Sequence, residues 1–374
     1  MGFEASGGAG PTVRIPCTLM RAGTSRGPFF LAADLPEDTA ARDQILLSAM
    51  GSGHDLQIDG LGGGHPLTSK VAIVSRSQHS GADVDYLFAQ VNVSARRVDT
   101  SPNCGNMLAG VGPFAIEKGL VTAQNGSTTV NIFNVNTGKI IEAVVQTPDG
   151  RVTFEGNCRV DGVSDPAAPI QLSFVDSAGS KTGSLFPTGR PIDRIDDVDV
   201  TCIDMATPLV IMRAHDLGKS ATEEPSALDA DRSFMERLEA IRVEAGRRMG
   251  LGDVRALVIP KPVIVGSPRH GGTISARYFM PHAAHRAFAV TGAVGLATAI
   301  ATPGTIPHSY LLSGSDLDSI CIEHPTGTIE LALRHHADRA PVASVLRTVR
   351  KIFDGVVYAR TKQATLAVKS LMSA

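Results

Sequence analysis

The chain of 374 residues contains no tryptophan, and aromatic residues account for only 5% of it. This scarcity argues against the exposed aromatic platforms on which proteins stack single-stranded nucleic acids. The formal net charge of −2 leaves no excess of basic residues to attract a phosphate backbone or an anionic membrane surface. We therefore expect neither a nucleic acid nor a membrane as partner.

Cysteine is also scarce, and none of the five cysteines belongs to a CxxC pair. An odd number of widely spaced thiols is typical of a protein kept reduced in the cytoplasm, and not of a disulfide framework or a zinc site. The first ten residues lack the basic and apolar segments of a secretion signal, and no apolar stretch is long enough to cross a bilayer. The expected location is the cytoplasm, without a bound metal.

Hydrophobic residues and glycine, in contrast, are plentiful, at 43% of the chain and 38 residues. A chain of this length usually exceeds what one hydrophobic core can serve, so we expect two domains. The stretch 176–200 is rich in Ser, Gly, Pro and Asp, which is typical of a linker. We place the domains at 1–186 and 187–374, with the strand-like segment 355–359 as a candidate to return to the first domain.

Hydrophobic periodicity predicts a mixture of strands and a few helices. Strands are expected at 12–20, 84–93, 127–134, 138–145, 151–155, 256–265 and 272–279, and helices at 37–50 and about 229–250. Two further helical runs of small residues, 107–115 and 291–297, each open on a glycine turn. Because one such run lies in each half, an ancient duplication is plausible.

The segment Asn103-Cys104-Gly105-Asn106 stands directly before the first of these small-residue runs. A thiol there would lie where the first amides of a helix converge. This place favours negative charge, and it can activate a thiol or bind a carboxylate. The alternative is a buried structural cysteine, and the local sequence leaves both interpretations open.

Lys70 follows a glycine-rich segment, 60–64, and precedes the apolar run 71–74. A dinucleotide-binding loop is excluded because His65 occupies the third glycine position and a strand, not a helix, follows. Lys70 is either a solvated lysine at a strand start or a desolvated one. Desolvation would lower its pKa toward the range useful for a general base.

Other polar residues gather near predicted strand ends, namely Arg21, Ser25, Arg26, Arg269, His282, His285 and Arg286. The two histidines lack a third nearby ligand, which favours anion binding over zinc. No nucleophile elbow, phosphate-binding loop or kinase motif is present. The residues together indicate a cofactor-free proton-transfer site for a small polycarboxylate.

Three segments resemble the signatures of the PrpF family, which contains 2-methylaconitate isomerases and 4-oxalomesaconate tautomerases and belongs to the diaminopimelate epimerase-like superfamily. They are Met20-Arg21-Ala22-Gly23-Thr24-Ser25-Arg26-Gly27, Asp59-Gly60-Leu61-Gly62-Gly63 with Thr68-Ser69-Lys70, and Asn103-Cys104-Gly105-Asn106. The resemblance implies an α+β fold of two similar domains, each a curved β-sheet wrapped around a central helix, with the active site between them. The segments look closest to the tautomerase branch.

The chain also departs from the related sequences. Related epimerases use two cysteines as an acid/base pair; Cys104 matches the first, but Thr291 stands at the second position. The resemblance therefore implies Lys70 as the second proton-transfer group. Ala22 and Arg26 lie in the turn 21–27, where the related sequences usually have Gly and Lys. Ala22 would be strained if the backbone φ is positive at its position.

We expect Lys70 and Cys104 to be catalytic. The residues expected to bind the substrate are Ser25, Arg26, His65, Ser69, Asn103, Gly105, Asn106, Arg269, His285, Arg286, Thr291 and Gly292. The activity implied by the resemblance is cofactor-free isomerisation of 4-oxalomesaconate, in aromatic-acid or lignin-derived catabolism.

Three alternatives remain beside this activity: an aconitate or 2-methylaconitate isomerase, a silent carboxylate-binding protein, and a proline racemase-like enzyme, which Thr291 disfavours. A homodimer is possible from the sequence.

Overall fold

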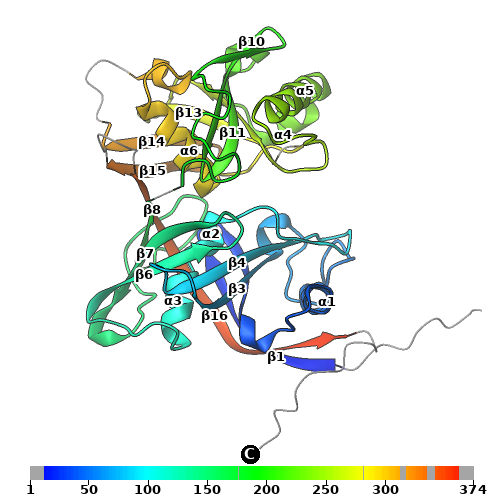
Figure 1. The fold of residues 1–374 in the computed structure, drawn as a ribbon, viewed down its shortest axis with the longest axis vertical. Helices are drawn as coiled ribbons and strands as arrows, with labels where there is room; N and C mark the ends of the chain where they lie inside the picture. Colours follow the sequence, from blue (N-terminus) through cyan, green and yellow to red (C-terminus); the bar gives the residue numbers. More distant parts are fainter. Residues whose placement is uncertain (1–11, 176, 281, 312–316, 335–341, 362–374) are drawn as a thin grey trace, which may run out of the picture.

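The computed structural model describes residues 12–175, 177–280, 282–311, 317–334 and 342–361. They form two lobes stacked along the long axis of the molecule (Figure 1). The first lobe contains β1 (Thr12–Ala22), β2 (Ser25–Leu31), β3 (Lys70–Arg76), β4 (Val84–Val91), β5 (Val98–Asp99), β6 (Gly126–Asn134), β7 (Lys139–Thr147) and β8 (Pro169–Phe174). The second contains β9 (Asp193–Ile195), β10 (Val198–Met205), β11 (Thr207–Arg213), β12 (Lys261–Gly266), β13 (Ile274–Tyr278), β14 (Ser319–His324) and β15 (Gly327–Arg334).

The last strand, β16 (Val342–Arg360), belongs to both lobes. It pairs with β15 and β8 through its first residues and then runs antiparallel along the whole of β1. Segment 355–359 therefore lies beside β1, with Gly355 opposite Cys17. The order β1-β2-β3-β4-β6-β7-β8-β16 returns to β1, so the sheet of the first lobe is a closed barrel.

The helices are α1 (Thr39–Met50), α2 (Gly105–Leu108), α3 (Val111–Glu117), α4 (Pro225–Ala230), α5 (Arg232–Arg248) and α6 (Val290–Ala301). All of α2 and all of α3 except Glu117 are buried, and these helices contact β1, β2, β3, β6 and β7. In α6 only Ala301 is not buried, and this helix contacts β10, β11, β15 and β16. A helix that is apolar on every side belongs inside a core, so each lobe is a curved sheet wrapped around a small-residue helix, as the sequence predicted.

The predicted 107–115 helix is interrupted. α2 ends at Leu108, and the N–H of Gly110 donates to the carbonyl of Met107 (3.0 Å) before α3 begins. At Gly110 the ring of Phe29 lies 2.4 Å from where a Cβ would stand. The close approach of barrel strand β2 therefore requires glycine at this break.

Other predicted elements also differ from the observed ones. The 229–250 helix is divided at Asp231, which caps α5 by accepting from Phe234 N (3.0 Å). The 151–155 strand is absent: Val152 and Phe154 pack on the core without forming a sheet ladder. The expected 256–265 strand begins only at Lys261.

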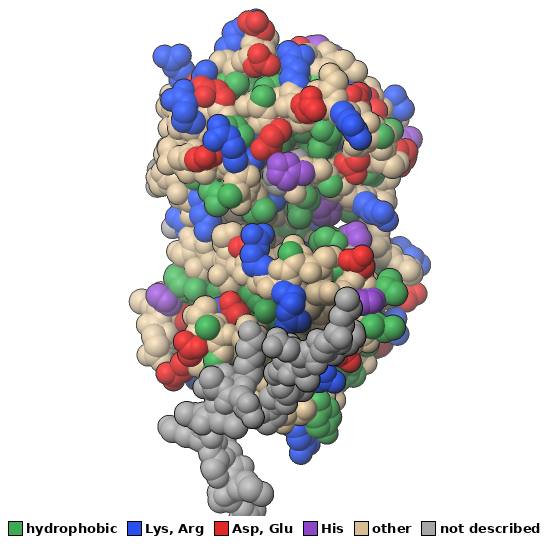
Figure 2. Space-filling model, turned by 90° about the vertical axis from the view of Figure 1, so that its right-hand side faces the viewer, with side chains coloured by type: hydrophobic (Ala, Val, Ile, Leu, Met, Phe, Trp, Pro, Cys, Tyr) green, Lys and Arg blue, Asp and Glu red, His purple; other side chains and the backbone are tan. Residues whose placement is uncertain are grey.

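Two longer helices, α1 and α5, lie outside the sheets. α1 contacts β4 and β16, whereas α5 contacts β9 and β12 and buries Phe234, Leu238 and Ile241. On the face shown in Figure 2, basic and acidic side chains are interspersed and no single sign of charge predominates. Among the residues that the structure describes, no helix has both the length and the apolar composition needed to cross a bilayer.

Residues 179–182, near the end of the predicted first domain, form hydrogen bonds with β10 of the second lobe. Ser180 and Thr182 donate to the carboxylate of Asp204 in β10 (2.6 and 2.9 Å), and Gly179 N donates to its carbonyl (2.8 Å). These bonds attach residues 179–182 to the second lobe.

Candidate active site

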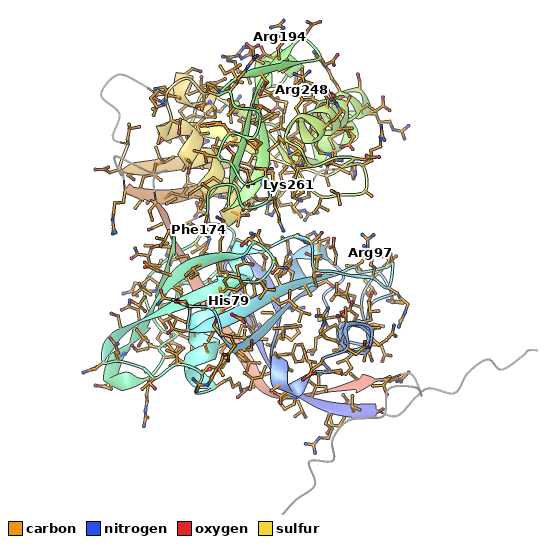
Figure 3. All side chains as sticks on the ribbon, viewed as in Figure 1. His79, Arg97, Phe174, Arg194, Arg248 and Lys261 are labelled. Atoms are coloured by element: carbon orange, nitrogen blue, oxygen red, sulfur yellow. The ribbon has the colours of Figure 1, made fainter. Side chains whose placement is uncertain are left out.

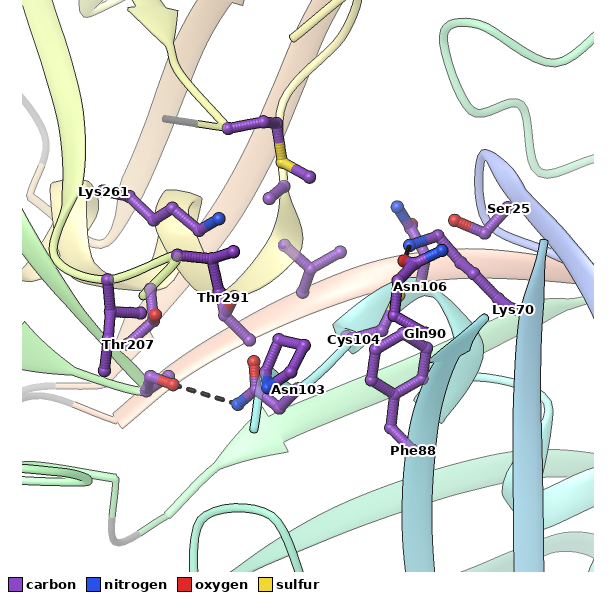
Figure 4. A pocket seen from close by; sticks show the side chains of 18 of the residues that line it. Ser25, Lys70, Phe88, Gln90, Asn103, Cys104, Asn106, Thr207, Lys261 and Thr291 are labelled. Carbon is purple, nitrogen blue, oxygen red and sulfur yellow. Dashed lines mark hydrogen bonds between the residues drawn. The ribbon is translucent and has the colours of Figure 1, made fainter. Parts of the chain in front are cut away.

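A pocket lies between the lobes, where the starts of α2 and α6 face each other. A Cβ added to Gly105 would come within 2.7 Å of the Cβ of Val290, so the two helix starts are in close contact. The pocket is lined by Lys70 and Cys104 from the first lobe and by Lys261 and Thr291 from the second (Figure 4). The geometry therefore brings together residues that are about 190 positions apart in the sequence.

Cys104 occupies the position directly before α2. Its carbonyl accepts hydrogen bonds from the hydroxyl of Tyr86 (3.2 Å) and from Leu108 N (3.0 Å). The residue is partly exposed and lines the pocket. It is thus not the fully buried structural cysteine that the sequence left open. The first N–H groups of a helix have no acceptor within the helix, so the start of α2 presents donors beside this thiol.

Lys70 is the first residue of β3, and it is 5% exposed. Its ammonium donates to Oε1 of Gln90 (2.6 Å) and lies 5.1 Å from the centre of the Phe88 ring. Burial lowers the pKa of Lys70, and the nearby Cys104 opposes this effect. Of the two interpretations that the sequence left open, the structure shows the desolvated lysine, and its surroundings increase the neutral fraction that a general base requires.

Gln90 orients Lys70. Its amide nitrogen donates to the carbonyls of Ser69 (2.8 Å) and Pro66 (3.1 Å), which turns the amide oxygen toward the lysine. Gln90 lies opposite Lys70 in the β3–β4 register. We had not assigned Gln90 from the sequence, although the predicted neighbouring strand at 84–93 was the signal that could have found it.

Two polar atoms of the pocket walls lack a hydrogen-bond partner among the described residues: Oγ of Ser25 and Oδ1 of Asn106. The Asn106 amide nitrogen donates to Oγ1 of Thr24 (3.0 Å). Gly23, with φ +51°, comes so close to Asn106 that a Cβ would lie 2.0 Å from Oδ1. Positive φ therefore falls on Gly23, not on Ala22, and Ala22 is not strained.

Asn103 connects the two lobes across the pocket, because its amide nitrogen donates to the carbonyl of Ala206 (3.1 Å; Figure 4).

His285 and Thr291 line the opposite wall. Burial, aided by Lys70, lowers the pKa of His285 to about 4. Its Nδ1 accepts from Ala287 N (2.9 Å), which leaves the proton on Nε2. His285 therefore presents a neutral donor to the pocket.

Two predicted substrate ligands support the site from outside. Ser69 is fully buried and donates to the carbonyl of Val91 (2.8 Å) while accepting from Gln57 (2.7 Å). Gly292 lets α6 approach Tyr278, since a Cβ would lie 2.4 Å from the ring. Neither residue lines the pocket.

The remaining predicted ligands do not line the pocket either. Arg26 reaches toward the carbonyl of Leu61 (3.5 Å). Burial lowers the pKa of His65, and the positive charges of Arg286 and Lys70 lower it further. Arg286 therefore acts electrostatically on His65, although the two residues come from different lobes. Arg269 lies at a separate pocket with Arg213 and is not brought to the site.

The second lobe contributes a further lysine, Lys261, which the sequence did not single out. It stood within a predicted strand, and nothing in the local sequence distinguishes a cleft-facing lysine from a solvated one. Among the described residues, no three His, Cys, Asp or Glu side chains are grouped as metal ligands would be. The polar groups of this pocket instead suit a small anion that carries several oxygens.

Residues 12–360 match the family model described as PrpF protein. The chain is 56% identical to the putative isomerase YbhH of Escherichia coli strain K12, over 92% of this chain and 99% of that one. It is 49% identical to the 4-oxalomesaconate tautomerase of Pseudomonas putida, over 92% and 96%. The crystal structure of a methylitaconate-delta-isomerase superposes with a TM-score of 0.82 at 36% identity, covering 97% of this chain and 99% of the other.

Proposed function

Because this isomerase belongs to the PrpF family, we propose that it catalyses a 1,3-proton transfer on 4-oxalomesaconate without a cofactor. The observation that carries the proposal is the buried Lys70, whose pKa is lowered and which lies beside Cys104 in a pocket shared by both lobes. The lowered pKa increases the neutral fraction of the Lys70 amine, and the neutral amine is the form that can accept a proton from carbon.

In the first step, neutral Lys70 removes a proton from the carbon next to an activating carbonyl. The electron pair of the C–H bond spreads into a dienolate, whose charge rests on the keto and carboxylate oxygens. Donors at the site then stabilise this charge. They are the backbone N–H groups at the starts of α2 and α6, the hydroxyl of Ser25 and the Nε2–H of His285.

In the second step, the far carbon of the conjugated system receives a proton, and the double bond moves. The donor is either the ammonium formed on Lys70 or the thiol of Cys104. If Lys70 performs both transfers, the proton leaves and returns on one face of the substrate. Thr291 stands where a second thiol would be needed to work from the opposite face.

A second candidate substrate is a methylated tricarboxylate or dicarboxylate, because the structural relative at 36% identity is a methylitaconate isomerase. The same proton chemistry serves both candidates. We favour 4-oxalomesaconate because of the 49% identity to a tautomerase of that acid, and this would place the reaction after ring cleavage of an aromatic acid.

The direct test offers 4-oxalomesaconate, 2-methylaconitate and methylitaconate separately to the purified protein and follows each acid by absorbance and proton NMR. We expect turnover of 4-oxalomesaconate with a kcat/KM at least tenfold above that of the other two. Preferential turnover of a methylated acid would contradict the substrate but retain the chemistry. No turnover of any of the three would contradict the proposed function.

A further inference from the structure

Lys261 is the most unusual charged residue that the proposed steps leave unused. It begins β12 and is only 5% exposed, yet it lines the same pocket as Lys70. Figure 3 places it at the edge of the second lobe that faces the first. In Figure 4 its side chain extends into the pocket from the side opposite Lys70.

The chain segment before Lys261 is firmly held. Arg242 of α5 is fully buried and donates to the carbonyls of Val254 (2.9 Å), Leu257 (3.3 Å) and Ile259 (3.2 Å). Its guanidinium also forms two hydrogen bonds with Glu239 (2.6 and 2.7 Å). These bonds fix the turn that leads into β12, so the position of Lys261 is set by the fold.

The other two lysines of the pocket each have a protein acceptor. Lys70 donates to Gln90, and Lys181 donates to the carbonyl of Asn136. For Lys261, no hydrogen bond or ion pair of the ammonium is found within the described parts of the chain. A buried ammonium is unfavourable unless an anion compensates it.

The charges around Lys261 do not supply that anion. Lys70 on β3 and Arg242 on α5 are both positive, and Asp99 on β5 is the one opposing charge that acts on Lys261. Among the described residues the Asp99 carboxylate forms no ion pair with Lys261; its Oδ1 accepts instead from Ser101 N (2.8 Å) and Oγ (2.7 Å). Burial, together with Lys70 and Arg242, lowers the pKa of Lys261 to about 7.

We propose that Lys261 binds a carboxylate of the substrate from the second lobe, across the pocket from Lys70. This inference rests on the proposed function for the identity of the substrate, a polycarboxylate. It adds a charged contact that the second lobe contributes to the shared pocket. The substrate anion is the partner that this buried ammonium otherwise lacks, and Lys261 would then select for acids with a carboxylate far from the reacting carbons.

The test measures binding by calorimetry of tricarballylate, a tricarboxylate without a double bond to isomerise. Wild type, Lys261→Met, Lys261→Arg and the control Lys351→Met are compared. Lys351 is an exposed lysine that pairs with Glu117 (2.6 Å) outside the pocket. A charge-assisted contact corresponds to a loss of about 10- to 100-fold in affinity for Lys261→Met, with partial recovery in Lys261→Arg and no change in the control.

A second readout separates binding from support of the fold. Binding at pH 8 should take up a proton, seen as a difference in enthalpy between Tris and HEPES buffers, because the anion stabilises the charged form of Lys261. His285, Cys104, Lys181 and Asp99 also face the pocket. Lys70 is a second possible source of uptake, so Lys70→Met is measured as well; the uptake should persist in Lys70→Met and disappear in Lys261→Met.

Equal affinity of wild type and Lys261→Met for tricarballylate, or no binding by either, would overturn the inference. So would a fall in kcat on the physiological acid without a rise in KM. If the protein binds tricarballylate through Lys261 but leaves 4-oxalomesaconate unchanged, the proposed function fails while the inference stands. If the protein isomerises 4-oxalomesaconate but Lys261→Met binds tricarballylate with wild-type affinity, the inference fails while the proposed function stands.

Discussion

Replacement of Lys261 by methionine should stabilise the protein while weakening its binding of anions. The side chain is 5% exposed, and burial with two neighbouring cations lowers its pKa from 10.5 to about 7. Each pH unit of such a difference corresponds to about 1.4 kcal/mol of stability. The buried lysine therefore costs about 5 kcal/mol when it is fully charged, below about pH 6. Methionine has a similar length and needs no partner.

The sign of the pH dependence follows from the two states of the chain. In the unfolded chain, Lys261 keeps its proton up to about pH 10.5, whereas in the folded protein it releases the proton near pH 7. Wild type therefore gains stability as the pH rises between these values. The advantage of Lys261→Met should shrink accordingly, from about 5 kcal/mol below pH 6 to about 4 at pH 7.5 and about 2 at pH 9.

Urea denaturation at pH 6, 7.5 and 9 measures these differences, because the free energy of unfolding falls linearly with denaturant. Lys70, Arg242 and Asp99, the charged groups that act on Lys261, are present in both proteins, so their own titration largely cancels in the comparison. Lys351→Met serves as the control and should change stability by less than about 1 kcal/mol. A Lys261→Met variant that is less stable than wild type at all three pH values would refute this account of the buried charge.

Gln90→Glu should raise the pKa of Lys70, because it places a carboxylate beside the ammonium. The acidic limb of the plot of kcat/KM against pH should then move to higher pH, and an unmoved limb would argue against Lys70 as the base. Gly292→Ala should cost about 1–3 kcal/mol of stability, because its Cβ would lie 2.4 Å from the ring of Tyr278. A melting temperature equal to that of wild type would contradict the required close packing. Cys104→Ser should lower kcat at least tenfold if the thiol returns the proton, and single-turnover kinetics would locate the loss in the chemical step.

The local sequence was sufficient for most elements and for the centre of the site. Two apolar small-residue runs that open on glycine turns predicted the inner helices. Lys70 at the start of an apolar strand was recognised as a candidate base, although the sequence left its burial open. The interruption after Leu108 was not predictable, because the ring that forces it, Phe29, comes from a strand about 80 residues earlier.

The outer parts of the site were harder to predict because they depend on contacts between the lobes. Arg269 carried the charge expected of a carboxylate ligand, but its turn lies at another pocket. His285 reached the pocket, yet burial beside Lys70 keeps it neutral. Lys261 was overlooked since its burial results from the second lobe facing the first, which no local pattern encodes.

The central claim is that Lys70 is the base that removes a proton from carbon, and solvent exchange tests it most directly. Wild type, Lys70→Met and Lys351→Met would be incubated with 4-oxalomesaconate in deuterium oxide, and deuterium at each carbon would be followed by NMR. The account predicts deuterium at one defined carbon with wild type and the control, and none above background with Lys70→Met. Exchange at the wild-type rate in Lys70→Met would contradict the assignment of Lys70 as the base.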